Sequence, residues 1–223
     1  MAEYTTASDV LIAESRSDEV DTAIWSRYTS TTMTNNQTAH NQNTAINSTT
    51  IVGIRSPERK QAIVASDGQA TMEDTVIKNN TNKVRKLYQG EVLVGFAGST
   101  ADALTLFDKF EGQLEQYSGN LERAAVELTK EWRTDKVLRK LEALMIVVNK
   151  DSLLLISGGG DVLRPDQNVI GIGSGGPYAQ AAARALMENS DLSPKEIAQK
   201  AIQLTASIDI YTNDQISLEA IEW

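Results

Sequence analysis

Threonine is the residue type whose position most suggests chemistry in this chain. Thr49 and Thr50 stand where a polar segment, residues 26–48, meets the apolar pair Ile51 and Val52. A threonine hydroxyl is a weak nucleophile. If Thr49 became the first residue, however, its own α-amino group, which titrates near neutrality, could take the hydroxyl proton. Taken locally, the same β-branched residues also fit the commoner interpretation of a strand that simply begins here.

The rest of the composition makes a threonine nucleophile more attractive. The chain has no cysteine, which excludes thiol nucleophiles, disulfides and thiolate zinc sites, and it has one histidine, His40, within the polar segment. A Ser–His or Cys–His pair needs its histidine in a rigid setting. A hydrolase with this composition would therefore activate its nucleophile without imidazole. The formal net charge of -9 also disfavours nucleic acid as a partner.

Three further features could support such a nucleophile, and each also has a simpler interpretation. Asp67 follows a predicted strand within an Asp-Gly pair, which is common in turns. The basic residues 78–86 fit a solvated face. Alternatively, one of these lysines could be buried beside Thr49 and held there by an aspartate. Its charge would then lower the pKa values of the threonine amine and hydroxyl. Residues 95–100, which run from a predicted strand into a helix, fit a plain connection or a glycine N–H group that points at an oxyanion.

A glycine-rich stretch offers a rival function. Residues 171–176 match the pattern G-x-G-x-x-G between a predicted strand and a helix, which is typical of dinucleotide binding. The match lies late in the chain, no βαβ unit surrounds it, and the expected ribose-binding acid would fall inside the next helix. Nucleotide binding is therefore the weaker alternative.

Apolar periodicity predicts an α+β fold. Helices are expected in consecutive pairs between groups of strands, which favours two sheets face to face, covered by helix pairs, over a parallel sheet. The predicted strands are 50–55, 61–66, 91–96, 144–149, 152–157, 168–173 and 208–212, and the predicted helices are 101–117, 121–141, 177–187 and 194–206.

The first 48 residues differ from the remainder. Residues 1–48 are expected to be a disordered leader or propeptide, because their composition cannot bury enough apolar surface. Their acidic residues and the lack of an apolar core argue against a secretory signal or a mitochondrial transit peptide, so a cytoplasmic location is expected.

Four stretches resemble the HslV (ClpQ) family of bacterial, proteasome-like threonine peptidases. These stretches are residues 49–55, 66–111, 124–145 and 170–189, and the resemblance extends over essentially all of 49–223. It implies a four-layer αββα sandwich of the N-terminal nucleophile hydrolase type, with a proteasome-like peptidase domain at 49–223 and a leader at 1–48.

The resemblance also implies roles for individual residues. Thr49 would be the nucleophile, Lys83 the catalytic lysine and Asp67 the aspartate that pairs with it. Gly98 would lie at the oxyanion hole, and Ser174 near the threonine amine. A sodium ion would be bound through backbone carbonyls; the matching positions are Ala206, Asp209 and Thr212.

The resemblance further implies an assembly. Twelve copies would form two stacked hexameric rings, and an HslU-type AAA+ unfoldase hexamer would hydrolyse ATP and feed in unfolded protein substrates. Family members normally have at most a very short leader. The 48 residues before Thr49 are therefore either a propeptide cut at the Ser48–Thr49 bond or the product of an upstream start site. A non-catalytic ring or scaffold subunit with an uncleaved leader is the alternative function.

Overall fold

Two larger antiparallel sheets and two helix pairs form most of the described part of the chain. The computed structural model describes residues 49–98, 100–136, 138, 141 and 143–223. The predicted leader and His40 lie outside these residues. No helix among those described has the length and apolar character needed to span a membrane. The elements are β1 Thr50–Ser56, β2 Gln61–Ser66, β3 Ala70–Met72, β4 Thr75–Lys78, β5 Val84–Leu87, η1 Tyr88–Gly90, β6 Val92–Ala97, α2 Thr100–Gln116, α3 Leu121–Thr134, β7 Leu144–Val148, β8 Leu153–Ser157, β9 Val162–Leu163, β10 Val169–Gly173, α4 Gly176–Asn189, α5 Pro194–Ala206 and β11 Ser217–Glu222.

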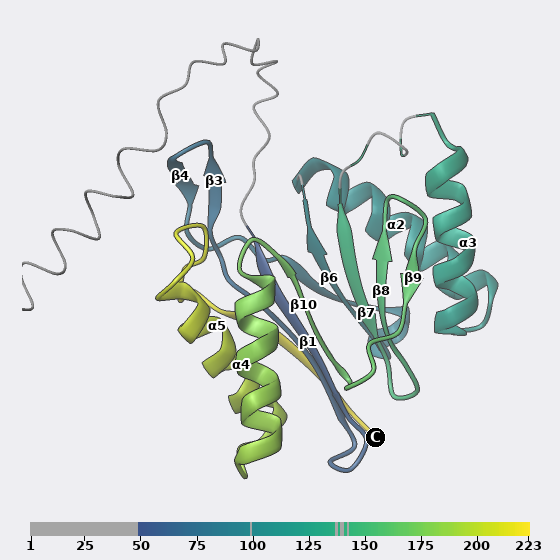
Figure 1. Ribbon diagram of the computed structural model, residues 1–223. Helices are drawn as coiled ribbons and strands as arrows, with labels where there is room; N and C mark the ends of the chain where they lie inside the picture. Colours follow the sequence, from purple (N-terminus) through teal and green to yellow (C-terminus); the bar gives the residue numbers. More distant parts are fainter. Residues whose placement is uncertain (1–48, 99, 137, 139–140, 142) are drawn as a thin grey trace, which may run out of the picture. The chain divides into compact units, whose positions relative to one another are not determined.

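The sheets are layered between the helix pairs. The first sheet has the order β10-β1-β2-β11 and the second has the order β5-β6-β7-β8-β9, while β3 and β4 form a separate hairpin. Helices α4 and α5 cover the outer face of the first sheet, and α2 and α3 cover that of the second (Figure 1). This arrangement confirms the predicted four-layer αββα sandwich.

Side-chain alternation along β1 shows how the sequence builds these layers. Val52 and Ile54 point toward α4 and α5, whereas Ile51 points toward the second sheet. Gly53 shares that inner face, where a Cβ atom would lie 2.6 Å from Ile146 Cγ2. Gly95 on β6 does the same from the other side, 2.7 Å from Ile51 Cγ2. Glycine at these two positions lets the sheets approach each other.

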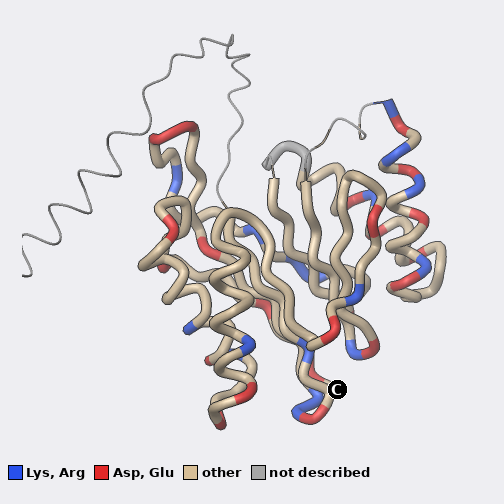
Figure 2. Tube along the Cα trace, viewed as in Figure 1, with Lys and Arg blue, Asp and Glu red and all other residues tan. Residues whose placement is uncertain are grey.

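Three apolar layers hold the sandwich together, and charge is kept outside them. The strands of both sheets are largely uncharged, while Lys, Arg, Asp and Glu lie mainly on helices and connections (Figure 2). The layers are represented by Phe110, Leu128 and Trp132 beneath α2 and α3, by Ile51, Leu93 and Ile146 between the sheets, and by Ile54, Ala198 and Ile202 beneath α4 and α5.

The predicted helix 121–141 is too long. Helix α3 ends at Thr134, because Asp135 takes extended backbone angles while its N–H still donates to the Glu131 carbonyl. The Asp135 carboxylate then accepts the N–H of Leu138 at 3.0 Å, an arrangement that competes with helix continuation. Leu138 is buried although it lies beyond α3. Its apolar side chain therefore packs in the core without being part of the helix, which is why the helical spacing of apolar residues extended too far.

The last predicted strand, 208–212, is wrong. These residues form turns after α5, with the N–H of Thr212 donating to the Asp209 carbonyl at 3.1 Å. Ile208 and Ile210 are 53% and 78% exposed, so their apolar alternation does not face a core. The strand that completes the first sheet is β11, which pairs with β2 through Ser217–Glu222.

Candidate active site

The predicted nucleophile lies at the start of β1, between the two sheets. Thr49 is 6% exposed. Strand alternation places its side chain on the same inner face as Ile51. The next residue, Thr50, donates its N–H to Asp67 Oδ1 at 2.8 Å and accepts the N–H of Asp67 at its carbonyl at 3.1 Å. Asp67, directly after β2, thereby fixes the backbone of Thr50 and so the position of Thr49.

Asp67 and Lys83 form a buried ion pair, a pairing that the resemblance implied. The Lys83 ammonium donates to Asp67 Oδ1 at 2.7 Å, and the two side chains are 7% and 0% exposed. The second carboxylate oxygen accepts the N–H of Gln69 at 2.8 Å. Burial lowers the pKa of Lys83, while the charge of Asp67 and its hydrogen bond oppose that shift. Lys83 is therefore not part of a solvated basic face, which was the alternative interpretation of residues 78–86.

Gly173 is required by the position of Thr49. This last residue of β10 pairs with Thr50 and has a φ of +87°. A Cβ atom built on it would lie 1.8 Å from the Thr49 carbonyl oxygen, well inside any permitted contact. Gly173 was not among the predicted site residues, although a glycine within a strand is a signal for close backbone approach.

Gly98 lies just beyond the end of β6, on the sheet that faces Thr49. Its φ is +153°, and a Cβ atom there would lie 3.0 Å from both the Phe96 ring and Ala143. Strand β6 is also tied to the lysine, because the N–H of Phe96 donates to the Lys83 carbonyl at 3.1 Å. The oxyanion role of Gly98 stays a prediction.

Ser174 belongs to a set of hydroxyls around one carboxylate. Its hydroxyl donates to Asp209 Oδ2 at 2.7 Å, and the Thr212 hydroxyl donates to the same oxygen at 2.5 Å. Thr212 Oγ1 lies 2.6 Å from Thr50 Oγ1, which also accepts the N–H of Gly175 at 3.1 Å. The carboxylate of Asp209 is thus linked through the Thr212 hydroxyl to Thr50, the residue after the predicted nucleophile. The resemblance implied a role for the Asp209 carbonyl alone, and no local spacing links its carboxylate to Ser174, 35 residues earlier.

The predicted cation site lies at the C-terminal end of α5, in the turns that follow. Among the described residues, the carbonyls of Ala206 and Thr212 accept no hydrogen bond, whereas that of Asp209 accepts the N–H of Thr212. Carbonyl oxygens at the negative end of a helix dipole suit a hard cation, so the residues present fit sodium. Within the described chain no cluster of His, Cys, Asp or Glu side chains is arranged to hold a metal.

The fold speaks against nucleotide binding at residues 171–176. Strand β10 pairs with β1 in the antiparallel sense, so this glycine-rich turn does not open a βαβ unit. A Cβ atom on Gly171 would lie 2.1 Å from the Gly176 carbonyl oxygen, and one on Gly175 would lie 2.3 Å from Thr50 Oγ1. These glycines permit close packing within the chain.

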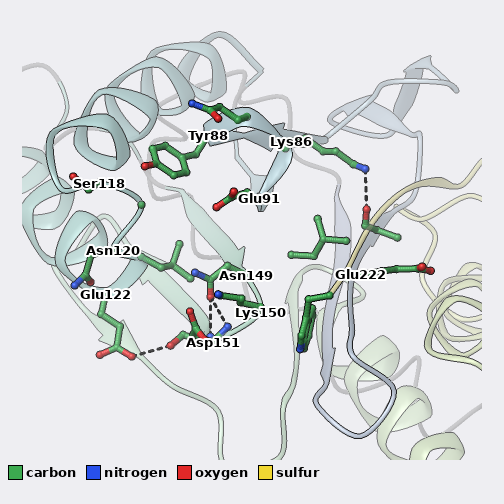
Figure 3. Close-up of a pocket in the computed structure, with 18 residues that line it drawn as sticks. Lys86, Tyr88, Glu91, Ser118, Asn120, Glu122, Asn149, Lys150, Asp151 and Glu222 are labelled. Carbon is green, nitrogen blue, oxygen red and sulfur yellow. Dashed lines mark hydrogen bonds between the residues drawn. The ribbon is translucent and has the colours of Figure 1, made fainter.

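A surface pocket away from Thr49 adds no residue to the candidate site. It is lined by the η1 turn, the α2–α3 connection, the β7–β8 turn and the end of β11 (Figure 3). Those strand ends are opposite to the ends that carry Thr49 and Gly98. Its polar groups also bond to each other: Lys86 donates to the Ala220 carbonyl at 2.8 Å, and Ser152 donates to Glu122 at 2.8 Å.

Comparisons with known proteins agree with this geometry. The proteasome subunit family matches residues 46–221. The ATP-dependent protease subunit HslV of Thermoanaerobacter pseudethanolicus is 58% identical over 174 residues, which cover 78% of this chain and 98% of that protein. Its counterpart from Caldicellulosiruptor saccharolyticus is 57% identical over 171 residues, which cover 76% and 96%.

A solved structure agrees as well. The crystal structure of eukaryotic HslV from Trypanosoma brucei superposes with a TM-score of 0.74 at 40% identity, covering 78% of this chain and 99% of that one. With Thr49 directly before β1, a buried Asp67–Lys83 pair that also binds the N–H of Thr50, and these relatives, the chain belongs to the proteasome subunit family, among its HslV-type threonine peptidases.

Proposed function

We propose that this chain is the peptidase subunit of an ATP-dependent protease and that it cuts unfolded proteins with Thr49 as an N-terminal nucleophile. The observation that carries the proposal is the buried Asp67–Lys83 pair, whose carboxylate also holds the N–H of Thr50. A carboxylate and an ammonium buried beside a threonine are suited to tuning the pKa of a hydroxyl and an amine, since nearby charge acts strongly where water is excluded.

The reaction follows from the two groups of one residue. The α-amino group of Thr49 takes the proton of its own hydroxyl, and Oγ1 bonds to the carbonyl carbon of the substrate. The C–N bond then breaks as the proton passes to the leaving amine, and an ester between Thr49 and the substrate remains. Water hydrolyses that ester and restores the hydroxyl. Gly98 is proposed to donate its N–H to the oxyanion, and Ser174 to lie near the amine.

The amine must be free for this chemistry. We therefore propose that residues 1–48 are a propeptide, removed when Thr49 attacks the Ser48–Thr49 bond. While that bond stands, the nitrogen of Thr49 is an amide and cannot act as a base.

The proposed setting is an ATP-dependent complex in the cytoplasm. The relatives named above are subunits of ATP-dependent proteases, which supports an HslU-type AAA+ unfoldase hexamer as partner. Two stacked hexameric rings of this chain would enclose the sites. A sodium ion on the carbonyls of Ala206, Asp209 and Thr212 would order the turns that carry the Asp209 and Thr212 side chains toward Thr50. Exchange of sodium for choline should then lower the Tm.

Intact mass and peptide hydrolysis test the proposal together. Wild-type protein should lose residues 1–48 and hydrolyse a peptide faster when the unfoldase and ATP are added. Thr49→Ala should keep its leader and be inactive. Thr75→Ala, an exposed threonine of β4, is the matched control and should behave as wild type. A wild-type chain that retains its leader and stays inactive with the unfoldase would instead support the scaffold function.

A further inference from the structure

Ser66 is a fully buried serine that the proposed reaction does not use. It ends β2 and is 0% exposed, and within the described chain its hydroxyl has no hydrogen-bond partner. Two residues earlier, Val64 lies in the apolar layer between the sheets, so alternation turns the Ser66 side chain to the same inner face.

The register places Ser66 beside the nucleophile. Ile51 of β1 is directly opposite Ser66, and Thr49 is two residues before Ile51 on the same face. Diagonal neighbours across an antiparallel pair are close enough for their side chains to interact, directly or through one water. Asp67, which holds the Lys83 ammonium, is the next residue in the chain.

A buried hydroxyl without a partner costs free energy, and alanine would fill nearly the same space without that cost. Such groups in folded proteins usually bond to an ordered water that has two or more polar partners. The inward residues of the facing strand β6 here are Gly95 and Ala97, which offer no side-chain hydrogen bond. Thr49, two positions before Ile51, is polar and lies on this face, and Asp67, the residue after Ser66, bonds to the Lys83 ammonium at 2.7 Å.

We propose that Ser66 is a positioning residue of the peptidase site, whose hydroxyl holds one ordered water that also accepts a hydrogen bond from the Lys83 ammonium. An ammonium can donate three hydrogen bonds, so the bond to Asp67 does not exclude a second bond from Lys83 to a water. The water fixes the direction of the Lys83 side chain relative to Thr49. This inference rests on the proposed function of Lys83.

Ser66→Ala tests the inference in the full chain, with Ser56→Ala as the matched control. Ser56 lies at the far end of β1, where its hydroxyl donates to Glu58. Loss of the water should lower kcat about three- to tenfold in Ser66→Ala and leave KM unchanged, whereas Ser56→Ala should keep both values. A high-resolution crystal structure of the wild type should show a water within about 3.2 Å of both Ser66 Oγ and Lys83 Nζ.

Two results would overturn the inference. One is a crystal structure with no water between Ser66 and Lys83. The other is a Ser66→Ala variant that keeps the wild-type kcat, in particular with a raised Tm, because the hydroxyl would then be an unsatisfied group without a role. A failure of the proposed function would give a different result. In that case Thr49→Ala would hydrolyse the peptide as well as the wild type does, whereas the crystal structure would still show whether a water joins Ser66 and Lys83.

Discussion

Replacement of Gly173 by alanine should inactivate the enzyme. The new Cβ atom would start 1.8 Å from the Thr49 carbonyl oxygen and 2.7 Å from the carbonyl carbon, both of them backbone atoms that cannot rotate away. Relief of the contact therefore needs the two strands to separate by about 1 Å or more. A displacement of this size at a reacting group costs roughly 100-fold in rate, and we expect kcat of Gly173→Ala to fall by about that factor or more.

A matched control separates this contact from backbone strain. Gly173 has a φ of +87°, which by itself penalises alanine by about 1–2 kcal/mol. Gly90 has nearly the same φ, +88°, but nothing lies within 4 Å of its Cβ position. Gly90→Ala should therefore lose stability and keep its kcat, so the difference between the two variants isolates the contact with Thr49.

The assay is peptide hydrolysis with the unfoldase present, run below the Tm of each variant. Intact mass adds a second readout, because a displaced Thr49 should also slow removal of the leader. Equal kcat values and equal leader removal in Gly173→Ala and Gly90→Ala would refute the reasoning, since they would mean that the position of the Thr49 backbone does not limit catalysis.

Three further outcomes are expected at the surrounding residues. Asp67→Ala should lower the free energy of unfolding by about 3–5 kcal/mol in urea denaturation, because Lys83 is left buried without its counter-charge; a smaller loss in Asp67→Ala with Lys83→Met would confirm that cause. Burial holds the pKa of Lys83 in the folded state below its ordinary 10.5. At a pH between the folded-state pKa and 10.5, the unfolded state therefore binds this proton more readily than the folded state. Stability should therefore rise with pH up to about 10.5. Tm measured against pH should lose this slope in Lys83→Met and keep it in the exposed-site control Lys86→Met. Asp209→Ala should lower kcat about tenfold, since Thr212 loses its acceptor, and Asp209→Asn should retain most of the activity; equal kcat values for the two would contradict this.

Much of the fold could be predicted because its signals are local. Short apolar runs rich in Val and Ile predicted the strands that became β1, β2 and β10, and the predicted helix 194–206 became α5, whose start carries a capping box of Ser193 and Glu196. Elements without such patterns were missed. The hairpin β3–β4 exposes Met72, Val76 and Ile77, so its apolar residues follow no buried face.

The chemistry of the site was predictable by residue type and by resemblance. A chain with one histidine and no cysteine has few ways to activate a nucleophile, which made a threonine more attractive, and the resemblance then implied that Thr49 is that threonine. The pairing of Asp67 with Lys83 was expected from the resemblance, and the structure places the two charges in contact.

By itself, the sequence determined which groups could react and which periodicities would form strands and helices, since both depend on residue type and near neighbours. Tertiary structure alone decided the rest. The 1.8 Å contact that excludes a side chain at Gly173 and the hydrogen bonds that Ser174 and Thr212 donate to the Asp209 carboxylate depend on how separate strands and turns meet. So does the burial of Ser66, whose hydroxyl has no hydrogen-bond partner among the described residues. Contacts of this kind arise when two sheets close on each other, and no spacing along the chain encodes their distances.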